Sequence, residues 1–270
     1  MKNLFAIVLV LVSFNLPAGT DQKLNVFVSI PPQKYFVEKI GGGRVTVNVM
    51  LAPGQNPETF EPRPRQIRML SNAQLYFRIG VPFENNWLDI MKAQSDEIHF
   101  IECCTQLMLD QDPHIWTSLK NARFISRLIF ESLAGIDPEG LDMYENNFQA
   151  LLQELDELDE DISNILKDSG TSYFIVSHDS WNYFARDYGL HQLAIESSGR
   201  EKGPRGLVQL IEIAKREEIK TVFIQQQHPL GPARTIAREL NANIVVIDPL
   251  AENYIENLRE VSKKIAGVIK

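Results

Sequence analysis

Short runs rich in Val, Ile and Phe alternate along this chain with segments that have the three- and four-residue spacing of amphipathic helices. In the first half, strand-like runs are found at 24–30, 45–51, 73–79 and 97–101, and helical patterns at 33–40, 63–71, 84–93 and 116–134. The second half repeats the plan, with strands expected at 172–176, 191–195, 221–224 and 243–247, and helices at 180–188, 204–217, 232–240 and 254–268. Because this alternation needs right-handed crossovers, it predicts an α/β fold with mainly parallel sheets.

Between the halves lies the longest helical pattern of the sequence. Asp137-Pro138 is a typical helix start, and apolar residues then recur at three- and four-residue steps from Leu141 to Leu166, ahead of Ser169-Gly170. About 30 residues that rise ~1.5 Å each make a rod of roughly 45 Å. A coiled-coil partner is the alternative, but the apolar stripe covers only about four heptads. The pattern therefore favours one long helix that joins two lobes.

These patterns divide the chain into segments. We expect a signal peptide at 1–18, an N-terminal α/β lobe at 19–136, a long linking helix at 137–169 and a C-terminal α/β lobe at 170–270. In the first segment Lys2 supplies a positive charge, residues 4–14 are apolar, and Pro17-Ala18-Gly19 offers small residues near a cleavage site. A retained anchor is the alternative, but the apolar run is short for a transmembrane helix.

Composition narrows the possible locations and partners. Since no cysteine lies near the cleavage site, we expect no lipid anchor and a periplasmic protein. The formal net charge of −8 argues against nucleic-acid binding and is compatible with a cation as partner. The two cysteines, Cys103 and Cys104, are adjacent, and neighbours rarely form a disulfide. Burial as small apolar residues explains them more simply than binding of a soft metal does.

Side chains that can bind metals stand near the ends of several predicted strands. His178 follows the strand-like run at 173–177, Asp248 follows 244–247, and Glu58 lies in the loop after 45–51. His114 precedes the helical pattern at 116–134. Ligands in open α/β sheets bind beyond the carboxyl ends of the strands, so the four groups would line a cleft between facing lobes. Two imidazoles and two carboxylates suit Zn²⁺, Mn²⁺ or Fe²⁺.

Each of these residues also has a simpler explanation. A lone histidine at a helix start is often a cap, Asp248 before Pro249 suits an Asx turn, and Glu58 could be solvated. His228 follows the strand at 221–224 and points to the same edge, so it could replace Glu58 as a ligand. His99 and His191 lie in or beside strands and are expected to be structural.

A family resemblance strengthens the metal interpretation. The motifs that carry it, in chain order, are Pro53-Gly54 with Asn56-Pro57-Glu58-Thr59-Phe60-Glu61-Pro62, then Gly80 to Glu84 with Trp87-Leu88, Asp112-Pro113-His114-Ile115-Trp116, Tyr144 with Asn147, Ser177-His178-Asp179 with Tyr183-Phe184, and Asp248-Pro249-Leu250. Over essentially the whole mature chain, the sequence resembles the metal-specific solute-binding proteins of bacterial ABC importers, the ZnuA/TroA-like group for zinc and manganese.

The resemblance implies two lobes joined by one long helix, with the metal ion held between them for delivery to an ABC-type membrane permease. The implied ligands are His114, His178 and Asp248. Position 58 departs from the family pattern, which usually has His, so the expected site is Glu58, His114, His178 and Asp248. A further carboxylate shifts the expectation toward Mn²⁺ or Fe²⁺, whereas the affinity order and the histidine at position 178 keep Zn²⁺ ahead. We expect a monomeric binding protein and no catalysis.

Two other classes of function compete with this one. A metal-dependent hydrolase would keep an open coordination position for water and need a general base such as Asp179 or Glu61, yet no HExxH-like element is present. A binder of an organic solute would use aromatic residues in the cleft, and Trp116 and Trp181 are available for that.

Overall fold

The computed structural model describes residues 23–103, 107–108, 112–167, 169–197 and 200–267. The expected signal peptide therefore lies outside the described residues, as does Cys104. Cys103 is buried, as expected of a small apolar side chain. Of the described helices, none is long and apolar enough to cross a membrane.

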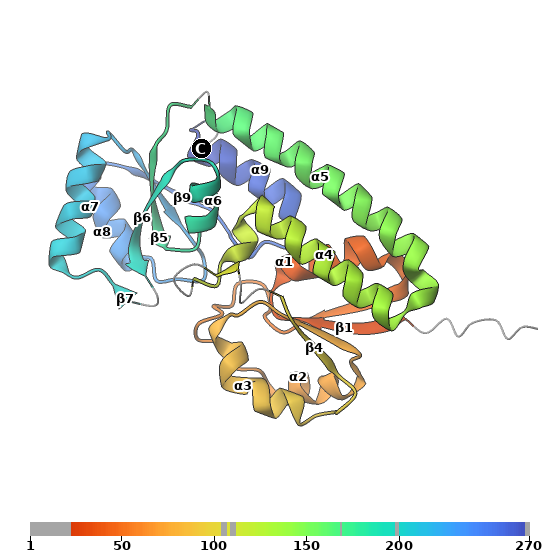
Figure 1. Cartoon of the computed structure of the whole chain (residues 1–270). Helices are drawn as coiled ribbons and strands as arrows, with labels where there is room; N and C mark the ends of the chain where they lie inside the picture. Colours follow the sequence, from red (N-terminus) through yellow and green to blue (C-terminus); the bar gives the residue numbers. More distant parts are fainter. Residues whose placement is uncertain (1–22, 104–106, 109–111, 168, 198–199, 268–270) are drawn as a thin grey trace, which may run out of the picture.

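The N-terminal half forms a four-stranded parallel sheet in the order β2-β1-β3-β4. Its strands are β1 (Leu24–Val28), β2 (Val45–Val49), β3 (Leu75–Arg78) and β4 (His99–Glu102). The connecting helices are α1 (Pro31–Gly41), α2 (Pro64–Met69) and α3 (Pro82–Lys92). Each begins at a proline, whose fixed φ and missing N–H suit the first helical turn. Helices α2 and α3 lie on one side of the sheet and α1 on the other (Figure 1).

The C-terminal half forms a five-stranded sheet in the order β7-β6-β5-β8-β9, in which only the short β7 runs antiparallel. The strands are β5 (Tyr173–His178), β6 (His191–Ser197), β7 (Arg200–Glu201), β8 (Thr221–Ile224) and β9 (Asn243–Val246). The helices are α6 (Asn182–Asp187), α7 (Pro204–Arg216) and α8 (Gly231–Leu240). Both halves thus confirm the predicted α/β lobes with mainly parallel sheets.

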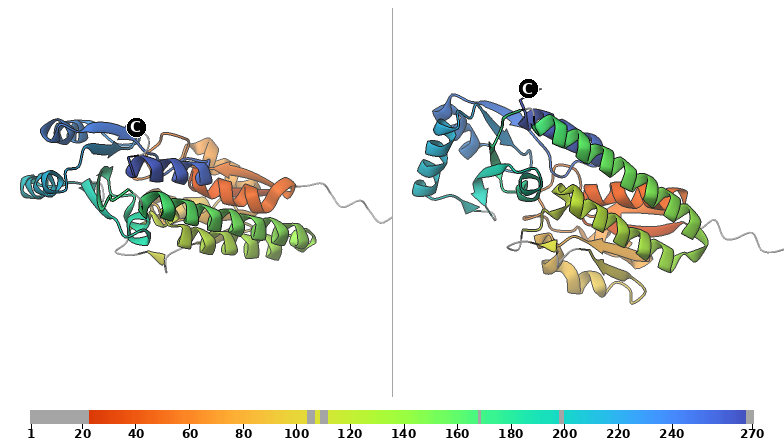
Figure 2. Two further views of the ribbon diagram at one scale, coloured as in Figure 1. Left: turned by 90° about the horizontal axis from the view of Figure 1, so that it is seen from above. Right: turned by 45° about the horizontal axis from the view of Figure 1, so that its top comes forward.

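The remaining described α-helices are α4 (Leu119–Ile136), α5 (Leu141–Lys167) and α9 (Tyr254–Ile265). The 27-residue α5 is the predicted long helix, and it packs against α1, α4 and α9 (Figure 2). The helical run starts at Pro138 with Asp137 at the N-cap position, as predicted, but its first turn, Pro138–Gly140, is 3₁₀ and α5 proper begins at Leu141. Asp137 makes no side-chain cap hydrogen bond there. Its carboxylate instead accepts hydrogen bonds from Arg44 and Tyr144.

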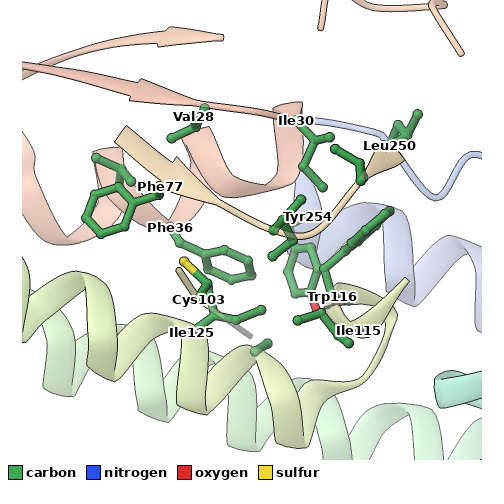
Figure 3. Packing of buried hydrophobic residues seen from close by; sticks show 14 of the residues in the cluster. Val28, Ile30, Phe36, Phe77, Cys103, Ile115, Trp116, Ile125, Leu250 and Tyr254 are labelled. Carbon is green, nitrogen blue, oxygen red and sulfur yellow. Dashed lines mark hydrogen bonds between the residues drawn. The ribbon is translucent and has the colours of Figure 1, made fainter. Parts of the chain in front are cut away.

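One apolar core joins the two lobes. Tyr254, at the start of α9, is buried with its ring 4.7 Å from that of Phe36 on α1. The Tyr254 hydroxyl donates a 2.6 Å hydrogen bond to the carbonyl oxygen of Trp116. Leu250, between β9 and α9, packs into the same region (Figure 3). The segment that follows β9, from Leu250 to the start of α9, therefore packs against the helix α1 of the first lobe.

Candidate metal site

Parallel pairing brings the carboxyl ends of β5, β6, β8 and β9 to one edge of the second sheet. His178 is the last residue of β5, and the register pairs it with Glu196 of β6. His228 follows β8 and Asp248 follows β9. With neighbouring strands roughly 4.8 Å apart, Glu196 stands one strand from His178, and the end of β9 stands two strands away.

The first lobe contributes Glu58, from the loop between β2 and α2. Its backbone N–H donates a 2.8 Å hydrogen bond to the side-chain oxygen of Asn56, an Asx turn that fixes the loop. The amide of Asn56 in turn reaches the carbonyl oxygen of Gln227 in the other lobe, at 3.5 Å. The Glu58 carboxylate is thereby held against the edge that carries His178.

The ligand atoms of Glu58, His178, Glu196 and His228 all lie within 4.8 Å of one another. Oε1 of Glu58 is 3.6 Å from Nε2 of His178. Oε1 of Glu196 is 3.7 Å from Nδ1 of His178 and 3.6 Å from Nδ1 of His228. These distances are long for hydrogen bonds, so the four side chains converge without bonding one another directly.

His114 lies beside this cluster, with its ring 5.2 Å from that of His178. The carboxylate of Asp112 accepts from the His114 backbone N–H at 2.9 Å and lies 2.7 Å from its Nδ1. The amide of Asn182 donates to the other oxygen of Asp112. A carboxylate at Nδ1 holds the proton there and leaves the Nε2 lone pair for an ion, the usual support of a metal-binding histidine.

Asp248 stands at the same edge but is not among the four residues whose ligand atoms converge. Its Oδ1 accepts from the side-chain amide of Gln227 and from the backbone N–H of Leu250, both at 2.9 Å. Both bonds use Oδ1, so Oδ2 is the oxygen that would meet an ion. The expected Asx turn with Leu250 is therefore present, alongside any role in metal binding.

Burial keeps the two clustered histidines neutral. It lowers the pKa of His178 to about 2, and the neighbouring His114 and His228 lower it further. Burial likewise lowers the pKa of His228 to about 4, together with charge on His114. Neutral imidazole is the form that binds metals.

The pKa of the Glu58 carboxyl shifts in the opposite direction. Burial raises the pKa of Glu58, and the negative charge of Glu196 raises it further, although His114 opposes this. Two carboxylates that repel each other beside neutral imidazoles favour a cation between them.

The structure also shows where the other histidines lie and adds one residue, Glu196, to the cluster. Glu196 was not predicted as a site residue, because the strand was expected to end at residue 195 and its partner depends on the register of β5 with β6. The signal available was its place at the end of a strand. His99 and His191 are exposed and remote from the converging ligand atoms. His228, the alternative to Glu58, lies in the cluster together with Glu58.

Comparison with known proteins identifies the family of this chain. The family model for ZnuA, described as zinc-uptake complex component A, periplasmic, matches residues 26–268. A crystal structure of ZnuA is 39% identical with a TM-score of 0.87, covering 91% of this chain and 99% of that one. A zinc-bound deletion mutant of ZnuA is also 39% identical, with a TM-score of 0.86 over 91% of this chain and 97% of that one.

A more distant relative is the manganese ABC transporter substrate-binding lipoprotein PsaA of Streptococcus mitis. It is 25% identical over 275 residues, which cover 92% of this chain and 89% of the relative. The chain therefore belongs to the ZnuA family, a family of extracytoplasmic metal-binding proteins rather than enzymes.

Proposed function

We propose that this protein captures a divalent transition-metal ion between its lobes and delivers it to an ABC-type membrane permease. The observation that carries the proposal is the convergence of Glu58, from the first lobe, on the buried His178 of the second. His178 is 2% exposed and neutral, and its buried Nδ1 has no hydrogen-bond partner among the described residues, which a bound ligand would explain. The ZnuA relatives, one of them solved with zinc, support the same assignment.

The proposed ligands are Glu58, His114, His178 and Asp248. Glu58 and His114 both lie beside the His178 ring. Asp248 would contribute Oδ2 from the end of β9, across the sheet edge. Four protein ligands close the coordination sphere of zinc, as a binding protein requires and a hydrolase does not.

Zinc is the first candidate for the ion, with manganese and iron as alternatives. Imidazole ligands suit zinc, and the affinity order places Zn²⁺ above Mn²⁺ and Fe²⁺ at comparable ligands. The carboxylates of Glu58 and Glu196 make the site harder and bring Mn²⁺ and Fe²⁺ closer. Competition between equal concentrations of Zn²⁺ and Mn²⁺, followed by elemental analysis, decides between them.

Thermal unfolding of chelator-treated protein tests the function. A ligand that binds only the folded state at 100 times its dissociation constant stabilises it by about 2.7 kcal/mol, so one equivalent of a tightly bound ion raises the melting temperature. We expect this rise with Zn²⁺ or Mn²⁺ and none with Mg²⁺. No rise with Zn²⁺, Mn²⁺ or Fe²⁺ would remove the proposed function.

Substitutions then test the site. We expect the largest loss of affinity from His178→Ala and a large loss from His114→Ala. The matched control is His99→Ala, because His99 is exposed on β4. Glu58→Ala should weaken binding, and Glu58→His should tighten zinc by restoring an imidazole. Equal effects at all three histidines would contradict the assignment.

We also propose that the protein is exported to the periplasm, with residues 1–18 removed and no lipid attached. The apolar run at 4–14 and the periplasmic description of the family support this. The mass of the protein recovered from the periplasm checks it, since cleavage leaves a chain that begins near residue 19.

A further inference from the structure

We propose that His178 serves two alternative positions for the ion, one at each nitrogen of its ring. We call the first the Nε2 station; its ligands are Glu58, His114 and His178, with Asp248. We call the second the Nδ1 station; its ligands are His178, Glu196 and His228, with Asp179 beside them. The inference rests on the proposed function and extends it, because Glu196 and His228 are not in the ligand set that the sequence predicts.

The two edges of the His178 ring face different partners. Nε2 is 3.6 Å from the Glu58 carboxylate, which comes from the first lobe. Nδ1 is 3.7 Å from Oε1 of Glu196 and 3.6 Å from Oδ1 of Asp179, both in the second lobe. The nitrogens of an imidazole point away from each other, so an ion bound at one edge cannot share the lone pair of the other.

Nδ1 of His178 is buried and has no hydrogen-bond partner among the described residues. A buried polar atom without a partner is costly and calls for an explanation, such as a ligand that the site receives. Nδ1 of His114 shows the contrast, because it is held by Asp112 at 2.7 Å. His114 is therefore committed to one orientation, whereas His178 keeps both nitrogens available.

The spacing at the Nδ1 edge suits a metal ion. Oε1 of Glu196 is 3.7 Å from Nδ1 of His178 and 3.6 Å from Nδ1 of His228. Donors bound tetrahedrally at about 2.0–2.2 Å lie roughly 3.3–3.6 Å apart, so the distances to Glu196 fit, and the stacked rings of His178 and His228 must turn toward a common point to bind one ion. The site is protected as well, because the side chains of His178, His228 and Glu196 are 2%, 5% and 17% exposed.

Strand order explains why this second set exists. β6 and β8 flank β5, so Glu196 and His228 reach the His178 ring from either side within one lobe. The rings of His228 and His178 are stacked with centroids 4.1 Å apart. The Nδ1 station is built from one lobe only, whereas the Nε2 station needs Glu58 from the other. An ion passing between the stations would exchange ligands without leaving His178.

The test follows the nitrogens of His178 by NMR of protein labelled with ¹⁵N in histidine, titrated with Zn²⁺. A neutral imidazole offers one lone pair, so wild type is expected to bind one Zn²⁺ at this ring, through Nε2. The double variant Glu58→Gln/His114→Gln is expected to bind one Zn²⁺ more weakly, with the metal-induced ¹⁵N shift moved to Nδ1 of His178. Adding His228→Gln should abolish binding.

The controls distinguish a failure of the Nδ1 station from a failure of the proposed function. His228→Gln alone should still bind one Zn²⁺ through Nε2, and His99→Gln should behave as wild type. Circular dichroism and thermal unfolding of each metal-free variant establish that it is folded. If wild type binds Zn²⁺ but the folded double variant binds none, or still uses Nε2, the Nδ1 station is wrong and the proposed function stands. If wild type binds no Zn²⁺, Mn²⁺ or Fe²⁺, the proposed function itself is wrong.

Discussion

The indole Nε1 of Trp116 donates a 2.7 Å hydrogen bond to the carbonyl oxygen of Pro249, 133 residues further along the chain. Trp116 stands two residues after His114, and Pro249 directly follows Asp248. The bond therefore joins the loops that carry two of the proposed ligands, His114 and Asp248. The carbonyl of Trp116 is itself held by the Tyr254 hydroxyl, so the connection is anchored in the common core.

Trp116→Phe removes this bond and leaves the Pro249 carbonyl without its partner. Loss of a partner for a buried polar group costs about 1–3 kcal/mol, and the smaller ring leaves a gap. We expect a lower free energy of unfolding in urea for the metal-free protein, and weaker metal binding because the His114 loop loses its support. Trp87→Phe, on the half-buried face of α3, is the control. Equal losses for the two variants would contradict the role given to Trp116.

Asp112→Asn should weaken metal binding with little effect on the fold. The carboxylate accepts from His114 and Asn182, and hydrogen bonds from His114 lower the pKa of Asp112 although burial acts to raise it. Changes to such outer partners of metal ligands typically cost 10–100-fold in affinity, so roughly that loss is expected in zinc competition titrations. Asp89→Asn, on the exposed side of α3, should bind as wild type. An unchanged affinity in Asp112→Asn would show that His114 needs no such support.

Asp137→Asn should destabilise the protein in a pH-dependent manner. Hydrogen bonds from Arg44 at 2.6 and 2.7 Å hold the pKa of Asp137 below its usual range; burial opposes this and Tyr144 assists. A lowered folded pKa stabilises the native state above the unfolded pKa, near 3.9, and the contribution is lost as pH falls through the folded pKa.

Because the Arg44 side chain is 39% exposed, we expect a loss of about 1 kcal/mol at pH 7. Urea unfolding at pH 7 and at pH 3 measures the difference, which should shrink in acid. Asp142→Asn, exposed in the first turn of α5, serves as the control. A difference of the same size at both pH values would exclude the ionised pair as its source.

Acid should destabilise the metal-free protein through His178 and His228. Their pKa values fall to about 2 and about 4, chiefly by burial, whereas an unfolded histidine titrates near 6.5. Between pH 6 and 4 the unfolded chain therefore binds protons that the folded chain excludes, and stability falls with pH by roughly 1 kcal/mol per unit for each histidine. The slope of the unfolding free energy against pH measures this.

His228→Gln should reduce that slope, because it removes one of the two excluded protons. His99→Gln should leave the slope unchanged, since His99 is exposed on β4, away from the two buried histidines. Identical slopes in wild type and His228→Gln would contradict the assignment of a depressed pKa to His228.

The strands and their parallel order could be predicted because the chain alternates two periodicities. The predicted strand at 221–224 coincides with β8, and most others differ only at their ends. The helix start at Asp137-Pro138 could be predicted, but the bond from Arg44 to the Asp137 carboxylate could not, because Arg44 lies 93 positions away. Asp137 keeps the N-cap position that local sequence favours, while its side chain pairs with Arg44.

The site was predictable where it depends on strand ends and not where it depends on register. His178 and Glu58 were found from their positions after apolar runs, and they converge. Glu196 was not predicted as a site residue, because its position beside His178 follows from the pairing of β5 with β6. Asp248 was found by the same rule as His178, yet β8 lies between their strands, and sequence alone carries no strand order.

The apolar core shared by Phe36, Trp116 and Tyr254 has a consequence for how this chain can be divided. A cut after α5 would separate Phe36 from Tyr254, and each fragment would present an aromatic surface to water. Neither half should then survive alone as a stable expression product, and heating should melt the intact chain in a single cooperative step. Any displacement of one half against the other must keep the side chains of Phe36, Trp116 and Tyr254 packed together. The displacement is therefore limited to sliding of these packed side chains.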